Sequence, residues 1–256
     1  MTTLTVPNWS IYAPEAEPHW ERLIAPCTVH YCQGDPDHGR TVTAFSGPWA
    51  EVEAALFRLA EDILPRIDLR TQTGVHPRIG ALDVCPFVGP NDAAGFAERF
   101  GARFDVPTVL YERSDTAGSS LPAIRNAGRD APATRWGVTT VGERGFLVAM
   151  NVDLAVDDLP LARRVAREIR TRREAGEPGF AGVRALGFAL PSRGIVQVSM
   201  NLTDPDRSLP DDLVRFVEAR APIAGTELIG VIRERDLPGA TRLPIAPAQV
   251  VDGTPC

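Results

Sequence analysis

Histidine is the residue type best suited to acid–base chemistry in this chain, and His76 has the most constrained setting of the four. It lies in TGVHPRIGALDV (73–84), directly before Pro77, and a residue that precedes proline is confined to extended backbone. Such a segment would hold the imidazole at the start of the strand that follows. Because the ordinary pKa of histidine lies near neutrality, His76 could accept and return a proton. On the residues alone, a catalytic base and a turn histidine bonded to backbone are equally supported.

A second group of reactive side chains lies in the loop GDPDHGRTV (34–42), which contains Asp35, Asp37, His38 and Arg40. A carboxylate beside an imidazole orients the ring and raises its basicity, so Asp35 and His38 could support acid–base chemistry. Glycine, aspartate and proline are also typical turn residues, and a solvated hairpin loop is the favoured interpretation of this segment taken alone. We expect no metal here, because a His–Asp pair within a loop is a weak metal signal.

The third candidate is the strand IVQVSMNL (195–202), where apolar and polar residues alternate. Successive side chains on a strand point to opposite faces, so Gln197, Ser199 and Asn201 would share one face. Such a face is usually only solvated. Three neutral hydrogen-bonding groups without charges also suit a ligand.

The elements that would position these residues are clearest in the second half. An apolar strand is predicted at 146–154, and a helix follows Asp157 and Asp158. The segments 183–190 and 195–202 read as a hairpin with a four-residue turn. Ser208 would open a second helix with Asp211 in the reciprocal capping position, and 226–232 would be the last strand. The order β-α-β-β-α-β is that of the ferredoxin-like split βαβ unit.

The first half repeats this order loosely and then extends it. Strands are predicted at 4–6, 27–33, 40–45, 80–87 and 107–112, helices at 14–25, 49–63 and 92–103, and a loop at 126–137. The sequence therefore predicts an α+β chain of two ferredoxin-like subdomains, 1–144 and 145–237, with an irregular proline-rich tail at 238–256.

Composition excludes several function classes. All 27 basic residues are arginine, which excludes a P-loop and Schiff-base chemistry, since both need a lysine. A net charge of −6 disfavours nucleic-acid binding. The four cysteines form no CxxC pair, so zinc and dithiol sites have little support. Without a membrane-spanning run or a signal peptide, we expect a soluble cytoplasmic protein.

Six motifs together resemble the formimidoyltransferase family: VPNWS (6–10), DPDHGRTV (35–42), GVHPRIGALDVCPFV (74–88), VGERGFLVAMNVDL (141–154), RALGFALPSRGIVQVSMNLTD (184–204) and GTELIG (225–230). The resemblance implies two α/β subdomains whose sheets face each other across a cleft, and a homodimer. It implies transfer of a formimino group from N-formimino-L-glutamate to N5 of tetrahydrofolate, a co-substrate, without a metal.

The same resemblance implies roles for individual residues. His76 would be the general base. The substrate and folate would be bound by Asn8, Arg40, Arg78, Gln197, Ser199, Asn201 and Glu227. The chain departs from the family pattern at Gly39, where an asparagine is usual before the arginine, and its segment between the subdomains is shortened.

Two alternatives stay open. The chain could use His76 for acid–base chemistry on a different small molecule without folate. It could also be a non-catalytic ligand-binding protein of the same fold, although the retained HPR segment at 76–78 argues against this, because a binding protein needs no rigid base.

Overall fold

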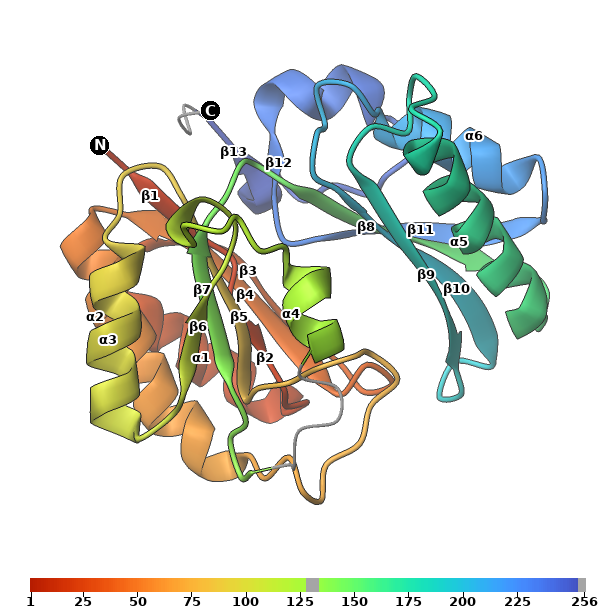
Figure 1. The fold of residues 1–256 in the computed structure, drawn as a ribbon. Helices are drawn as coiled ribbons and strands as arrows, with labels where there is room; N and C mark the ends of the chain where they lie inside the picture. The colour runs from red at the N-terminus through yellow and green to blue at the C-terminus, as the bar shows by residue number, and fades with distance from the viewer. Residues whose placement is uncertain (128–133, 253–256) are drawn as a thin grey trace. The chain divides into compact units, whose positions relative to one another are not determined.

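The computed structural model describes residues 1–127 and 134–252, and the chain divides into two compact units between Arg144 and Gly145 (Figure 1). Each unit consists of a β-sheet and the helices that pack on it, so the predicted α+β class with two sheet-containing subdomains is confirmed. No helix in the described ranges is both long and apolar enough to cross a membrane.

The first unit is built on a seven-stranded sheet with the order β1-β4-β2-β5-β7-β6, and β3 pairs with β4. Both β1 and β2 pair antiparallel with β4 and β5, so they act as one interrupted strand between them. The pairs β5–β7 and β6–β7 are parallel. The strands are β1 (Thr3–Thr5), β2 (Asn8–Trp9), β3 (Thr28–Asp35), β4 (Arg40–Gly47), β5 (Leu82–Val88), β6 (Thr108–Leu110) and β7 (Thr139–Glu143).

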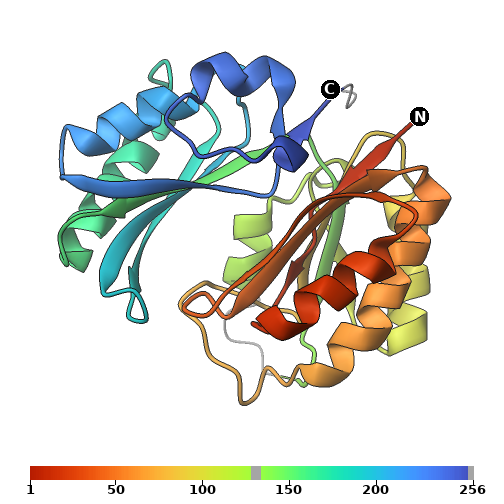
Figure 2. The same ribbon diagram turned by 180° about the vertical axis from the view of Figure 1, so that it is seen from behind.

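Three helices pack against this sheet to form the core of the first unit, and Figure 2 shows α1 and α2 side by side from behind. Helix α2 (Trp49–Ile63) buries four apolar side chains at the positions that its amphipathic pattern predicts: Val52, Leu56, Leu59 and Ile63. The core continues into an aromatic cluster in which Phe96 meets Trp49, Phe57, Phe87 and Phe100. The helices are α1 (Glu17–Ile24), α2 (Trp49–Ile63) and α3 (Ala93–Phe104), with a fourth, α4 (Leu121–Ala127), near the end of the unit.

The second unit has the predicted element order β-α-β-β-α-β. Its four-stranded sheet has the order β11-β8-β10-β9, and every neighbouring pair is antiparallel. The elements are β8 (Val148–Leu154), α5 (Leu159–Glu174), β9 (Val183–Leu190), β10 (Ile195–Leu202), α6 (Pro210–Glu218) and β11 (Ile223–Ile229). The acidic cap of α5 is confirmed, because the Asp158 side chain accepts a hydrogen bond from the Leu161 backbone amide.

Strand β7 and helix α4 of the first unit were not predicted. Strand β7 lies between β5 and β6, so the predicted strand at 107–112 is not a neighbour of β5. Helix α4 begins at Leu121, and its last residues overlap the predicted loop at 126–137; positions 128–133 of that loop lie outside the described residues.

The capping box predicted for the second helix of the second unit is wrong. Helix α6 begins at Pro210, with Leu209 as its N-cap and no side-chain cap. The Ser208 hydroxyl donates to the Ala181 carbonyl at 2.8 Å instead. Asp211 faces the tail of the chain, where it accepts hydrogen bonds from the backbone amides of residues 241 and 242.

The tail predicted as irregular is packed as far as it is described. Two 3-10 helices occupy Glu234–Gly239 and Pro247–Gln249, and Val250–Val251 (β13) pairs in parallel with Ile232–Arg233 (β12). Ala240 is also buried in this segment. The tail is therefore part of the second unit.

Candidate active site

The two histidine-bearing loops of the first unit pack directly against each other. One joins β3 to β4, and the other precedes β5. The Val75 backbone amide donates to the Asp37 carbonyl at 3.0 Å, and the Arg78 guanidinium donates to the Gly39 carbonyl at 3.0 Å. Two candidates that are far apart in sequence thus form one site.

Glycine makes this close approach of the loops possible. Gly39 has a φ of +58°, and a Cβ added there would lie 2.6 Å from the Thr73 carbonyl oxygen. A Cβ on Gly74 would lie 2.4 Å from the His38 carbonyl oxygen. Gly39, the departure from the family pattern, is therefore a residue that this packing requires.

The packing places the rings of His38 and His76 with their centroids 6.1 Å apart. The Asp35 carboxylate accepts from His38 Nδ1 at 2.9 Å and from its backbone amide at 2.7 Å. A carboxylate that accepts from Nδ1 fixes that nitrogen as the protonated one and places the lone pair of the neutral ring on Nε2. Asp35 therefore orients His38, the local relationship that the sequence predicted.

His76 is held in the same tautomer by backbone. Its Nδ1 lies 2.8 Å from the Pro77 carbonyl oxygen, which can only accept, so Nδ1 is the donor. In the neutral ring, Nε2 then carries the lone pair that can take up a proton. This bond agrees with the turn-histidine interpretation and also prepares the ring to act as a base.

The surroundings lower the pKa of His76 well below its usual range. His76 is only partly buried, but desolvation by the surrounding loops is the largest cause, because it disfavours the charged imidazolium. The positive charges of Arg40 and Arg125 act in the same direction. The hydrogen bond to Pro77 acts weakly the other way. His76 is therefore neutral, and able to accept a proton, at neutral pH.

Arg40 connects several parts of the site. Its guanidinium donates to Asn8 Oδ1 at 3.2 Å, to the Pro77 carbonyl at 3.2 Å and to Asp83 Oδ2 at 2.8 Å. Arg40 is 8% exposed, and burial lowers its pKa to about 10 despite the attraction of Asp83. It stays a cation at neutral pH and a fixed source of positive charge beside His76.

Among residues 1–127 and 134–252, Asp83 is the only acid paired with Arg40, and a second arginine shares it. The fully buried carboxylate also accepts from the Arg125 guanidinium and, at 2.8 Å, from the Ile79 backbone amide. Two guanidinium groups on one carboxylate leave a surplus positive charge. The Nε atoms of Arg40 and Arg125 are both buried and have no hydrogen-bond partner among the described residues, which suits an additional anionic ligand.

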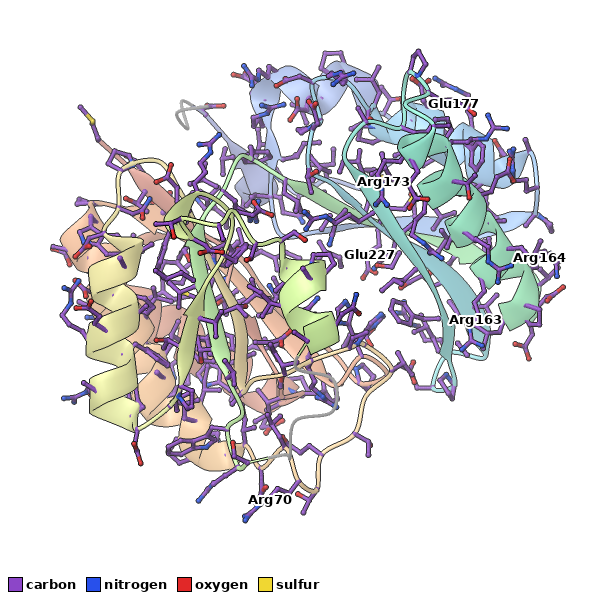
Figure 3. The ribbon with its side chains drawn as sticks, in the orientation of Figure 1. Arg70, Arg163, Arg164, Arg173, Glu177 and Glu227 are labelled. Atoms are coloured by element: carbon purple, nitrogen blue, oxygen red, sulfur yellow. The ribbon has the colours of Figure 1, made fainter. Side chains whose placement is uncertain are left out.

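The second unit carries a different polar group on its sheet. On adjacent strands, Gln197 Nε2 donates to Asp153 Oδ1 at 2.8 Å, and Asn151 Nδ2 donates to Glu227 Oε2 at 2.9 Å. Figure 3 labels Glu227 in this region of the second unit. Gln197 is fully buried, and its Oε1 has no partner within the described ranges.

The predicted site residues therefore fall into two groups. The first unit brings together Asn8, Asp35, His38, Arg40, His76 and Arg78. In the second unit, Gln197 and Ser199 lie on β10 and Glu227 lies on β11, with β8 between these two strands. Asn201, on the same strand as Gln197, is exposed.

Sequence reasoning missed four members of these groups: Asp83, Arg125, Asn151 and Asp153. Three of them carried a usable signal, since a single acid or amide between apolar neighbours on a buried strand must find a partner. Asp83 lies between Leu82 and Val84 in this way. Arg125 had no such signal, because it lies on the unpredicted helix α4.

Cysteine and metal chemistry receive no support in the described part of the chain. Burial raises the pKa of Cys32 to about 12 and raises that of Cys85 as well, so neither is a thiolate at neutral pH. No group of three or more histidine, cysteine, aspartate or glutamate side chains within residues 1–127 and 134–252 could hold a metal ion.

Comparison with known protein families shows that both units match the formiminotransferase domain. The model of the formiminotransferase domain, N-terminal subdomain, matches residues 19–133, and the model of the formiminotransferase domain matches residues 149–243. Together these two matches cover most of the chain.

Individual relatives agree with the domain models. The glutamate formimidoyltransferase of Streptococcus pyogenes serotype M1 is 31% identical over 231 residues, 77% of this chain and 76% of that protein. The one from Thermoplasma acidophilum is 30% identical over 241 residues, 79% of this chain and 77% of that protein. The formimidoyltransferase-cyclodeaminase of Gallus gallus is 33% identical over 248 residues, 82% of this chain but 45% of that protein. The chain thus spans less than half of the length of this larger relative.

Proposed function

Because the chain belongs to the formimidoyltransferase family, we propose that it transfers a formimino group from N-formimino-L-glutamate to N5 of tetrahydrofolate, with His76 as the base. The observation that carries this proposal is the state of His76. The ring is neutral, its Nδ1 is committed to the Pro77 carbonyl, and positive charge lies beside it.

The chemistry of the transfer matches such a base. N5 attacks the amidine carbon of the donor and forms the new C–N bond, and Nε2 of His76 takes the proton that N5 loses. The imidazolium returns this proton to the glutamate nitrogen, and the bond between that nitrogen and the amidine carbon breaks. The products are 5-formiminotetrahydrofolate and glutamate, and His76 ends neutral, as it began.

The charge of the first unit suits the donor. N-formimino-L-glutamate carries two carboxylates, and the guanidinium groups of the buried Arg40 and the partly buried Arg125 share one acid, Asp83. A substrate carboxylate accepting from an unpaired guanidinium Nε would compensate the surplus charge. Arg78, which is partly buried and donates to the Gly39 carbonyl, adds further positive charge to the same loops.

The test is an assay with both substrates. Purified protein with tetrahydrofolate and N-formimino-L-glutamate should form 5-formiminotetrahydrofolate, followed by absorbance, and omission of either substrate should stop the reaction. If product forms with neither this donor nor another formimino donor, the transfer proposal fails. Turnover of a different small molecule that depends on His76 but not on folate would then establish the alternative acid–base reaction.

Other parts of the proposal rest on the resemblance. Gln197, Ser199, Asn201 and Glu227 are proposed to contact the ligands, with Asp35 and His38 supporting the base. A homodimer and a cytoplasmic location are proposed as well. Sedimentation velocity of the purified protein tests the dimer, because a monomer of 27.7 kDa is readily distinguished from a pair.

A further inference from the structure

We propose that Asp83 is a positioning residue for His76, which acts through Arg40 and sets the orientation and tautomer of the imidazole. Only the kinetic test of this proposal, the measurement of kcat and KM, rests on the proposed function. Its spectroscopic readout concerns the ligand-free protein and stands independently of any substrate.

Asp83 organises three groups of the first unit at once. Its carboxylate is fully buried and accepts from Arg40, from Arg125 and from the backbone amide of Ile79. These donors come from β4, from α4 and from the loop that carries His76. A charged acceptor in a buried position fixes its donors strongly, because charge-assisted hydrogen bonds are short and strong and a lost partner leaves an unpaired charge.

Arg40 and the Pro77 carbonyl connect Asp83 to the imidazole. The same terminal nitrogen of Arg40 that donates to Asp83 at 2.8 Å also lies 3.2 Å from the Pro77 carbonyl oxygen. That carbonyl accepts from His76 Nδ1 at 2.8 Å. Asp83 therefore holds Arg40, Arg40 holds the Pro77 peptide, and the peptide holds the ring with its proton on Nδ1.

Asp83 also constrains the loop that carries His76 at two points. It fixes the Ile79 amide directly and the Pro77 carbonyl through Arg40, so the backbone on the C-terminal side of His76 is held on both sides of Arg78. Mutation of the residues that orient a metal-bound histidine costs about 10- to 100-fold in activity, and a loss of the same order is expected where a chain of hydrogen bonds orients a catalytic histidine.

The experiment compares two variants that remove the charge from a buried Arg–Asp pair. Asp83→Asn is the test. Asp236→Asn is the matched control, because Asp236 is 7% exposed and forms two 2.7 Å hydrogen bonds to Arg233 in the second unit. The protein is labelled with ¹⁵N at histidine, and the tautomer of His76 is read from its ring-nitrogen chemical shifts, with kcat and KM measured in parallel.

Both variants should lower the Tm. Only Asp83→Asn should convert His76 from a single Nδ1-protonated tautomer into a mixture and lower kcat by roughly 10- to 100-fold, with a smaller change in KM. If its His76 signals and kcat stay as in the unchanged protein while the Tm falls as in Asp236→Asn, Asp83 is merely structural and the proposal is overturned.

Arg40→Lys keeps the proposal testable if Asp83→Asn does not fold. Lysine preserves the positive charge, but it has one ammonium group in place of the planar fork of arginine. The positioning role predicts the same mixed tautomer in the ligand-free protein, and an unchanged tautomer would contradict it. Should the unchanged protein lack transferase activity while these variants alter the His76 tautomer, the proposed function fails and the positioning role holds.

Discussion

The two units place their polar groups in opposite electrostatic situations. In the first unit, Arg40 and Arg125 share one carboxylate beside a histidine whose pKa is lowered. In the second unit, each carboxylate of the sheet has an amide partner, Asp153 with Gln197 and Glu227 with Asn151. A surplus charge beside a base suits a chemical step, whereas paired neutral amides suit recognition by hydrogen bonds.

The largest expected effect is the loss of kcat when the proposed base of the first unit, His76, is removed. His76→Ala should lower kcat by about 10²- to 10⁴-fold, the usual contribution of a positioned general base, and leave the Tm nearly unchanged. His19→Ala is the control, since this partly exposed histidine belongs to α1 and lies 3.6 Å from the Asp62 carboxylate on α2. Activity in His76→Ala equal to that of the control would remove the base assignment.

The second prediction sharpens the role of the second unit. Gln197→Ala should raise KM roughly tenfold with a small change in kcat, since it removes one or two hydrogen bonds of about 1 kcal/mol each. Asn201→Ala, at an exposed position of the same strand, should raise KM by a smaller factor, because an exposed amide exchanges ligand hydrogen bonds for hydrogen bonds to water. A large loss of kcat with unchanged KM in Gln197→Ala would place this residue in the chemical step and contradict the division between the units.

The third prediction concerns the loop packing. Gly39→Asn, which installs the residue usual in the family, should lower the free energy of unfolding by roughly 1–3 kcal/mol, because its Cβ overpacks against the Thr73 carbonyl. Gly194 in the second unit also has a positive φ, +63°, but a Cβ there would meet nothing within 4 Å. Gly194→Asn should therefore stay within about 0.5 kcal/mol. Equal effects of the two variants in chemical denaturation would show that loop contact does not matter.

The smallest expected effect concerns pH. Arg125 lowers the pKa of His76, so Arg125→Gln should raise that pKa and move the acid limb of the kcat/KM profile to higher pH. A shift below about one pH unit is expected, since one unit corresponds to roughly 1.4 kcal/mol of interaction. In the unchanged protein the acid limb should lie below pH 6.5, the ordinary value for histidine. A limb that moves to lower pH in the variant would contradict the electrostatic account.

Periodicity was sufficient to predict the second unit and much of the first. Helix α2 occupies the residues from Trp49 to Ile63 that its apolar positions indicate, and the hairpin at 183–202 has the predicted strands. Strand β7 was missed because its sequence, TTVGE, is short and has only one apolar side chain, Val141. Its parallel pairing also depends on residues that are distant in the sequence. Helix α4 has seven residues and no buried side chain, so it carries no periodic signal.

The site was predictable where its constraint is local. His76 could be identified because proline follows it, and Asp35 could be linked to His38 because they lie three residues apart. The sharing of Asp83 between Arg40 and Arg125 depends on strand pairing and on the unpredicted α4, so the sequence alone did not indicate it. The surplus charge is thus a property of the tertiary structure.

The packed tail determines how the second unit can be isolated. Asp211 accepts hydrogen bonds from the backbone at 241 and 242, and β13 completes a parallel pair with β12. A fragment that stops at residue 237, the end of the predicted subdomain, would leave this carboxylate without its backbone donors and uncover the surface that Ala240 fills. An independently folding second half therefore has to reach at least to Asp252, and shorter pieces should be prone to aggregation.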